Sequence, residues 1–256
     1  MSTLSIDLVP CLSDNYAYLI TDAVQGLCAV VDPSEAGPVR ERLRARSAKL
    51  THILNTHHHP DHTGGNLELK EAFGAPVVGP EKDRARIPGL DVGVGEEAPW
   101  QFGSKPVAIL EIPAHTSGHI AFIFREDKAA FTGDTLFAMG CGRLFEGTPA
   151  MMWAAMQKLM ALPDDMRVYC GHEYTLSNAR FALTLEPDNA ALQARMREVT
   201  ELRAKGLPTI PTTIGLEKRT NPFMRPDSPE LRRTLGMEKA NDVDVLAETR
   251  RRKDNF

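Results

Sequence analysis

The sequence predicts an α/β fold, with a strand-rich first part and a helical second part. Over the first two-thirds of the 256 residues, short apolar runs alternate with turn residues. After Glu173 the pattern becomes helical. Apolar residues recur there at helical spacing, at Leu192, Met196, Val199 and Leu202. Because the chain is long enough for a domain with an appendage, we predict two domains, over residues 1–172 and 173–256.

Local patterns define the individual elements. The predicted strands are Ser5–Val9, Tyr16–Ile20, Leu27–Val31, Thr51–Asn55, Ala75–Val78, Val107–Ile112, Ile120–Phe124, Ala129–Phe131 and Val168–Cys170. The predicted helices are Glu35–Arg46, Gly65–Phe73, Pro149–Met160, Glu230–Leu235 and Asp244–Arg251. Thr148 suits the N-cap of the third helix, and Pro149 suits its first turn. Pro208–Thr213 is predicted to be a loop.

The composition limits the classes of function. The formal net charge of −4 argues against a general nucleic-acid binder, which is usually basic. No stretch approaches the ~18 uninterrupted apolar residues of a membrane span, and the first residues lack the pattern of a secretory signal. The four cysteines form no C-x-x-C pair, which favours a reduced compartment. We therefore expect a cytoplasmic protein with no nucleic-acid or membrane partner.

The segment His57-x-His59-x-Asp61-His62 directly follows an apolar strand. Imidazole and carboxylate groups in this pattern suit zinc, iron or manganese. Side chains two residues apart can point the same way, so His57 and His59 can bind one ion. Asp61 and His62 project differently and can reach a second ion. Gly64-Gly65 is expected to give the backbone freedom to turn into the next helix.

Six residues cannot complete two metal shells, so further ligands are expected at other strand ends. His115, Asp134 and His172 each follow a predicted strand. An exposed polar loop would leave these coincidences unexplained, so we predict a metal-dependent hydrolase that activates water. The remaining histidines have plainer interpretations. His58 is expected to point away from its neighbours and to support the ligands from outside the metal shell or to be structural. His119 is expected to pack or form hydrogen bonds, and His52 to lie in the core.

The H-x-H-x-D-H pattern resembles the signature of the metallo-β-lactamase superfamily. The resemblance implies a four-layer αββα sandwich followed here by a C-terminal helical domain. It implies two divalent ions per chain, zinc before iron or manganese. It implies a first metal site of His57, His59 and His115, a second of Asp61, His62 and His172, and Asp134 as the bridge. Asp61 and Asp134 are the implied catalytic carboxylates, and Asp134 would also help to orient the nucleophile.

Further segments resemble glyoxalase II, also called hydroxyacylglutathione hydrolase. They are residues 114–119, 131–137, 140–148, 169–175, 221–225 and the terminal R-x-x-K-D over 250–254. The resemblance implies hydrolysis of S-(2-hydroxyacyl)glutathione, typically S-D-lactoylglutathione, to D-lactate and glutathione in methylglyoxal detoxification. It implies a monomer whose partner is this small-molecule thioester. The implied substrate-binding residues are Arg143, Tyr174, Arg250 and Lys253. Some members of the family carry Lys in place of Arg143 and Tyr in place of Phe145.

Three other interpretations fit the sequence less well. A mononuclear persulfide dioxygenase of the same superfamily would not need the full second set of ligands or the helical tail. A nuclease would need an extended basic stripe, which this acidic chain lacks. A non-catalytic metal-binding module would need neither a complete two-metal set nor a basic substrate corner.

For the hydrolase, a thiolate leaving group needs little help from a general acid. Cys141 and Cys170 are not expected to act as nucleophiles.

Overall fold

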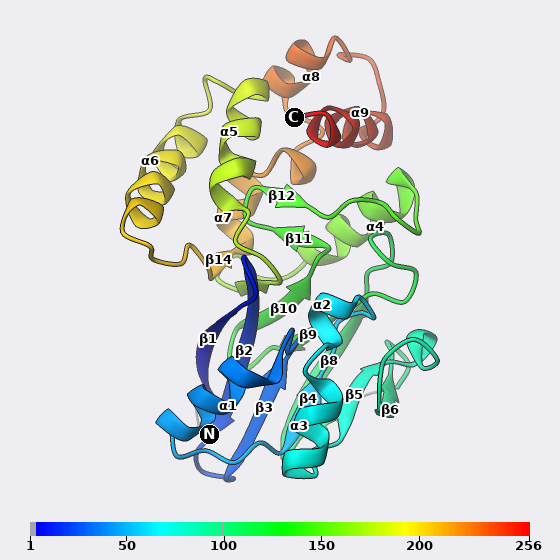
Figure 1. Ribbon diagram of the computed structural model, residues 1–256. Coiled ribbons are helices and arrows are strands. Elements are labelled where there is room, and N and C mark those ends of the chain that lie inside the picture. Colours follow the sequence, from blue (N-terminus) through cyan, green and yellow to red (C-terminus); the bar gives the residue numbers. More distant parts are fainter. Residues whose placement is uncertain (1–3, 99) are drawn as a thin grey trace. The chain divides into compact units, whose positions relative to one another are not determined.

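The computed structural model describes residues 4–98 and 100–256. The chain forms two compact units (Figure 1). Unit 1 comprises Met1–Glu111 and Gly118–Gly133, and unit 2 comprises Ile112–Ser117 and Asp134–Phe256. Unit 2 therefore includes part of the sequence that precedes the predicted boundary at residue 172. The predicted division into a catalytic domain over 1–172 and a substrate-binding domain over 173–256 stays a prediction about function.

The first sheet of unit 1 has six strands in the order β1-β2-β3-β4-β5-β6. They are β1 Ser5–Cys11, β2 Asn15–Asp22, β3 Leu27–Val31, β4 His52–Leu54, β5 Val77–Pro80 and β6 Leu90–Val94. The first three strands pair antiparallel, and β3 to β6 pair parallel. Parallel pairing places the carboxyl ends of β3, β4 and β5 at the same edge of the sheet. Chemistry-bearing residues that follow these strands therefore gather there.

Three α-helices of unit 1 connect these strands: α1 Ala36–Ala45, α2 Pro60–Thr63 and α3 Asn66–Phe73. A short 3-10 helix, η1, spans Glu81–Asp83. Val39 and Leu43 of α1 and Leu69 of α3 share a buried cluster with side chains of the first sheet, such as Leu19 and Val30. These two helices therefore form the outer layer over one face of the first sheet (Figure 1).

The opposite face of the first sheet packs on a second sheet. In unit 1 its strands are β7 Trp100–Phe102, β8 Lys105–Glu111, β9 Ile120–Phe124 and β10 Ala129–Gly133, which pair antiparallel in sequence order. Tyr18 of β2 meets Phe131 of β10 with ring centroids 5.6 Å apart, and Phe131 meets Phe124 at 5.9 Å. Aromatic side chains thus fill the space between the two sheets, because each buries a large apolar area.

Unit 2 is mainly helical. It contains the hairpin β11 Leu136–Phe137 and β12 Gly140–Cys141, and the antiparallel pair β13 Arg167–Cys170 and β14 Thr212–Thr213. Its helices are α4 Pro149–Met160, α5 Thr175–Leu185, α6 Ala190–Ala204, α7 Ile214–Thr220, η2 Pro222–Met224, α8 Pro229–Leu235 and α9 Asp242–Asp254. Ala179 and Ala182 of α5 pack with Leu192 and Val199 of α6. As predicted, Thr148 caps α4 by accepting from the backbone N–H of Met151 at 3.3 Å.

Most predicted elements are present within a few residues, but several short elements were missed and one loop was wrong. The sequence analysis did not predict β6, β7, β11, β12, α2, α5, α7 or the two 3-10 helices η1 and η2. The predicted loop Pro208–Thr213 ends in strand β14, where Thr212 pairs with Val168 of β13. This strand is only two residues long, so it leaves no alternating pattern in the sequence. Among the described residues, no helix combines the length and the apolar character that a membrane span requires.

Gly64 and Gly65 are needed for a different reason from the one predicted. Their φ angles are −61° and −84°, which any residue can adopt, so the expectation of special backbone freedom is wrong. Instead, a Cβ at Gly64 would collide with the carbonyl oxygen of Ser34, and a Cβ at Gly65 would lie 2.9 Å from the carbonyl oxygen of Pro33. These glycines allow the chain after α2 to pack directly on the backbone that follows β3.

Gly64→Ala should lower the free energy of unfolding by about 1–3 kcal/mol, because the added methyl group overpacks a backbone contact. Denaturant unfolding checks this. Gly37→Ala in α1 is the matched control, because nothing lies within 4 Å of the Cβ it would add. The control should leave the stability unchanged or raise it by up to about 1 kcal/mol through helix propensity. Equal effects of the two substitutions would contradict the close-approach argument.

Candidate metal centre and substrate-binding residues

The histidine loop, residues 56–62, follows β4 in unit 1 and is fixed at both ends. The carbonyl oxygen of Thr56 accepts from the backbone N–H of Ile120 at 2.9 Å. The side-chain amide of Asn55 donates to the carbonyl oxygen of His62 at 3.0 Å, and Asn55 in turn accepts from Asn66 of α3 at 2.7 Å. Asn55 and Asn66 are fully buried. The loop therefore has a defined backbone conformation.

His57 and His59 face each other through their ring nitrogens. Nε2 of His57 lies 3.2 Å from Nδ1 of His59. The Thr56 hydroxyl donates to Asp32 at 2.6 Å, so it can only accept from Nδ1 of His57, which lies 3.0 Å away. The hydrogen of His57 therefore sits on Nδ1, and its Nε2 carries a lone pair. That lone pair is directed toward His59, as metal ligation by both rings requires.

His62 and Asp61 form the second pair in this loop. Nδ1 of His62 lies 3.1 Å from Oδ2 of Asp32, a carboxylate that can only accept, so Nδ1 donates. Nε2 of His62 then carries a lone pair 3.6 Å from Oδ2 of Asp61. The same Asp61 oxygen accepts from the Asn15 side chain at 3.0 Å, which fixes the carboxylate. The predicted pairing of Asp61 with His62 is thus compatible with the local geometry.

Asp32 is a site residue that the sequence analysis missed. It directly follows β3, is almost fully buried and accepts from the backbone N–H of Thr56 at 2.8 Å. With the Thr56 hydroxyl and His62 as further donors, its carboxylate orients both His57 and His62. Oxygen and nitrogen atoms of Asp32, His57 and His62 all lie within 4.8 Å of one another. Because its oxygens already accept these bonds, Asp32 positions ligands and is not assigned as one. Its place at a strand end was the available signal.

In unit 2, Asp134 lies between His115 and His172. Its Oδ2 is 3.6 Å from Nε2 of His115 and 3.2 Å from Nε2 of His172. All three residues are at most 6% exposed. Nδ1 of His115 lies 2.9 Å from the carbonyl oxygen of Arg143 and must donate to it, so Nε2 again carries the lone pair. A Cβ at Gly142 would collide with the carbonyl oxygen of Asp134, so this glycine allows the close packing.

These donor sets fit divalent cations. In each unit, imidazole lone pairs point at a carboxylate oxygen or at another ring nitrogen, and a cation between such atoms is stabilised by both partners. The ligands are neutral nitrogen and anionic oxygen, which suit zinc, iron and manganese. Hydrogen bonds define the orientation of the rings of His57, His62 and His115. Each of these rings donates its Nδ1–H to a hydroxyl, carboxylate or carbonyl oxygen, which is the usual arrangement around protein-bound metals.

Of the other three histidines, His119 agrees with the sequence analysis, whereas His52 is only partly buried and does not lie in the core as expected. Nδ1 of His58 lies 3.1 Å from Oδ2 of Asp83, and its ring meets that of His59 with centroids 5.0 Å apart, so it does not point away from both neighbours as expected. His119 is fully buried and its ring stacks on that of His57, with centroids 4.5 Å apart and an interplanar angle of 16°. His52 begins β4 and meets the ring of Phe102 edge-on at 5.5 Å.

The predicted substrate residues all lie in unit 2. Nε of the exposed Arg143 is 3.7 Å from Oδ1 of Asp254. Arg250 is buried and binds the same carboxylate oxygen at 2.9 Å, while its other guanidinium nitrogen donates to the carbonyl oxygen of Cys141 at 2.8 Å. Arg250 therefore has a structural task in this arrangement. Its predicted contact with substrate stays a prediction.

Lys253 and Tyr174 remain accessible beside this cluster. Burial, with repulsion from Arg250 and Arg143, lowers the pKa of Lys253 to about 8. Its Nζ donates to the Ser177 hydroxyl at 3.2 Å. Tyr174 is 38% exposed, and its ring stacks on that of His172 at 4.7 Å with an interplanar angle of 5°. A molecule that contacted Tyr174 would therefore lie next to a predicted metal ligand.

The cysteines near these residues are unsuited to nucleophilic catalysis. Burial raises the pKa of the Cys141 thiol to about 11, although Arg250 opposes the shift. Burial also raises the pKa of Cys170. Since the thiolate is the nucleophilic form, both side chains stay protonated and unreactive near neutral pH. This agrees with the prediction that neither forms a covalent intermediate.

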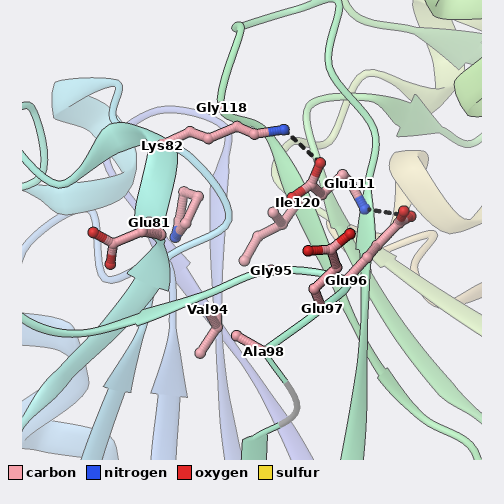
Figure 2. Close-up of a pocket in the computed structure, with 11 residues that line it drawn as sticks. Glu81, Lys82, Val94, Gly95, Glu96, Glu97, Ala98, Glu111, Gly118 and Ile120 are labelled. Carbon is pink, nitrogen blue, oxygen red and sulfur yellow. Dashed lines mark hydrogen bonds and ion pairs between the residues drawn. The ribbon is translucent and has the colours of Figure 1, made fainter.

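Unit 1 also contains a cavity of about 430 Å³ that lies apart from the predicted site residues (Figure 2). Its charged lining residues are four glutamates and one lysine: Glu81, Glu96, Glu97, Glu111 and Lys82. Lys82 binds Glu111 at 2.5 Å. The excess of carboxylates disfavours an anionic ligand, so this cavity does not suit the glutathione thioester implied by the sequence.

Comparisons with known proteins cover the whole chain. The family model for the metallo-beta-lactamase superfamily matches residues 13–172, and the model for the hydroxyacylglutathione hydrolase C-terminus matches residues 173–256. The hydroxyacylglutathione hydrolase of Rhizobium meliloti (strain 1021) is 52% identical and covers 100% of both chains. That of Methylococcus capsulatus (strain ATCC 33009 / NCIMB 11132 / Bath) is 53% identical and covers 99% of both.

A solved structure shows the same fold. The crystal structure of TTHA1623 in a di-iron-bound form is 26% identical to this chain, with a TM-score of 0.60. The match covers 84% of this chain and 98% of that chain. The matches confirm the predicted fold class, a metallo-β-lactamase fold followed by a helical C-terminal domain, and the predicted enzyme class. The chain therefore belongs to the hydroxyacylglutathione hydrolase, or glyoxalase II, family of thioester hydrolases within the metallo-β-lactamase superfamily.

Proposed function

We propose that this chain hydrolyses S-D-lactoylglutathione to D-lactate and glutathione, as a step in methylglyoxal detoxification. One structural observation supports this substrate independently of family membership. In unit 2, the segment Cys141-Gly142-Arg143 contacts both the predicted metal ligands and the predicted anion-binding cations. The Arg143 carbonyl holds His115, and the Cys141 carbonyl accepts from Arg250. A thioester held by its glutathione carboxylates would thus lie near the residues that promote its hydrolysis.

The proposed metal ligands are the seven residues that the sequence predicted. His57, His59 and His115 would hold one ion, Asp61, His62 and His172 would hold the other, and Asp134 would bridge them. Divalent ions held there would activate water for attack on the thioester carbonyl and would polarise that carbonyl. Zinc is the proposed native metal. The di-iron-bound form of TTHA1623 supports iron as the alternative.

The chain's own residues would prepare this reaction by orientation and charge. Asp134 is buried between two histidines, so its carboxylate is fixed where it can orient the attacking water. Asn15 fixes Asp61 in the same way in unit 1. The leaving glutathione thiolate has a conjugate acid with a pKa near ~8.5, so it departs without a dedicated general acid. This is compatible with the unreactive Cys141 and Cys170.

Glutathione binding is assigned to Arg143, Tyr174 and Lys253, with Arg250 as the fourth predicted contact. Arg143 can bind a carboxylate with two parallel hydrogen bonds, and Lys253 supplies a more compact charge. Tyr174 can pack its exposed ring edge on the thioester arm. Phe145, where some family members carry Tyr, is 61% exposed and lies 5.2 Å from the His115 ring, so it offers apolar contact only.

We further propose that the protein acts as a cytoplasmic monomer. All four cysteines are free and buried, as suits a reducing compartment. The proposed partner is a small molecule, and the proposed ligands and substrate contacts all come from one chain.

Metal analysis combined with a thiol-release assay tests the proposal. The wild-type chain should contain two divalent ions and hydrolyse S-D-lactoylglutathione. His59→Ala and Asp134→Ala should lose bound metal and should lose activity by more than the 10–100-fold typical of outer contacts to a metal site. Asp164→Asn is the control, because the side chain of Asp164 pairs with Lys218 at the surface and is not among the predicted site residues. Normal hydrolysis by metal-free protein would contradict the proposal.

The low pKa of Lys253 predicts a pH-dependent KM. Its ammonium group is charged below the pKa of about 8 and neutral above it. The KM for the anionic thioester should therefore rise between pH 7 and pH 9. In Lys253→Arg the guanidinium stays charged throughout, so the rise should be absent. Steady-state kinetics of both proteins with the same substrate check this, since titration of the substrate affects both equally. Parallel KM profiles would remove Lys253 from the substrate site.

A further inference from the structure

His58 separates the two proposed ligands His57 and His59, and its own side chain is held by Asp83. Nδ1 of His58 lies 3.1 Å from Oδ2 of Asp83. The His58 side chain is 16% exposed and that of Asp83 is 0% exposed. The ring of His58 also meets that of His59 edge-on, with centroids 5.0 Å apart. Because Asp83 fixes the His58 ring, it restricts both the backbone between His57 and His59 and the His59 ring that His58 contacts.

Asp83 is itself fixed by Arg86. Nε of Arg86 donates to Oδ1 of Asp83 at 3.1 Å, and NH2 of the same guanidinium contacts the same oxygen. The backbone N–H of Arg86 also donates to the carbonyl oxygen of Asp83 at 2.7 Å, which closes the turn after η1. A buried carboxylate is costly unless it is paired and hydrogen-bonded. Arg86 and His58 together meet that requirement.

The Asp83 carboxyl group also lies against Gly118. A Cβ at Gly118 would collide with Cγ and both oxygens of Asp83. Gly118 directly precedes His119, whose ring stacks on that of His57. Asp83 therefore contacts the histidine loop at His58 and packs against the segment that carries His119. Both contacts act on the orientation of His57, one through the loop backbone and one through the stacked ring.

We propose that Asp83 is a positioning residue for the metal-binding loop, acting through His58 and held in place by Arg86. This inference rests on the proposed metal role of His57 and His59. It assigns a task to the ion pair between the buried Asp83 and the more exposed Arg86. Asp83 would set the spacing and direction of the H-x-H pair, so its loss should weaken metal binding before it weakens the fold.

Zinc affinity of the full-length, metal-stripped protein tests the proposal, measured by competition with a chelator. Asp83→Asn replaces an acceptor by a donor at the His58 contact, so zinc affinity should fall roughly 10–100-fold, the range typical of outer contacts to a metal site. Glu81→Gln is the matched control. Glu81 lies in the same 3-10 helix as Asp83 and pairs with Arg84 at the same i,i+3 spacing, but its side chain is exposed. Its zinc affinity should equal that of the wild type.

Substitutions of His58 provide a second test in a loop residue. His58→Asn keeps an N–H near the position of Nδ1 and should bind zinc within about threefold of the wild type, whereas His58→Leu should lose roughly tenfold or more. The visible spectrum of the cobalt-substituted proteins should change in the same order. Thermal unfolding of the metal-free proteins shows whether the fold is affected.

These measurements distinguish a positioning role of Asp83 from a purely structural role, and they distinguish failure of this inference from failure of the proposed function. If Asp83→Asn and His58→Leu lower the melting temperature but bind zinc normally, Asp83 has only a structural role and the inference is overturned. If the wild-type chain binds no zinc, iron or manganese, the proposed function fails first and this inference with it. Weaker zinc binding in both variants, with a normal Glu81→Gln control, supports the positioning role.

Discussion

The buried carboxylate of Asp32 is the contact on which the histidine loop of unit 1 depends. Its place follows from the sheet: β3 and β4 pair parallel, so both strands end at the same edge, and the backbone N–H of Asp32 donates to Leu54 at 2.8 Å. That register brings Asp32 beside Thr56. The carboxylate can only accept, so it dictates which nitrogen of His62 carries the hydrogen and, through the Thr56 hydroxyl, which nitrogen of His57 does. The hydrogen bonds of the protein therefore fix the tautomers of His57 and His62 that metal ligation would require, independently of any bound ion.

Unit 2 uses a backbone carbonyl for the same purpose. The carbonyl oxygen of Arg143 fixes the hydrogen of His115 on Nδ1 and directs Nε2 toward Asp134. A carboxylate in unit 1 and a carbonyl in unit 2 are both acceptors without hydrogens, so neither permits the other tautomer. Removing such a partner leaves a buried N–H unsatisfied, which costs about 1–3 kcal/mol. The orientation of each imidazole is thus enforced by the cost of an unmade hydrogen bond.

The sequence alone indicated the proposed ligands more readily than the groups that orient them. His57, His115, Asp134 and the other proposed ligands follow strands, most of them in one short segment, and that pattern is local. Asp32 also follows a strand, but one aspartate before a proline resembles an ordinary turn. Asp83 gives no local signal, because its contacts to His58 and Gly118 are made across 25 and 35 positions of sequence. Such contacts depend on how strands pair and loops cross, which no short pattern records.

The basic corner of unit 2 follows from an unfavourable balance of charge. The carboxylate of Asp254 pairs with Arg143 and Arg250, and repulsion from both arginines contributes to the low pKa of Lys253. One carboxylate thus faces two guanidinium groups, and the ammonium group of Lys253 is repelled by both. Arg250 is stabilised by burial against the Cys141 carbonyl, so the excess charge falls on Arg143 and Lys253, which stay accessible. An added carboxylate would relieve this repulsion, and the proposed affinity for the carboxylates of glutathione is therefore a consequence of how the protein has placed its own charges.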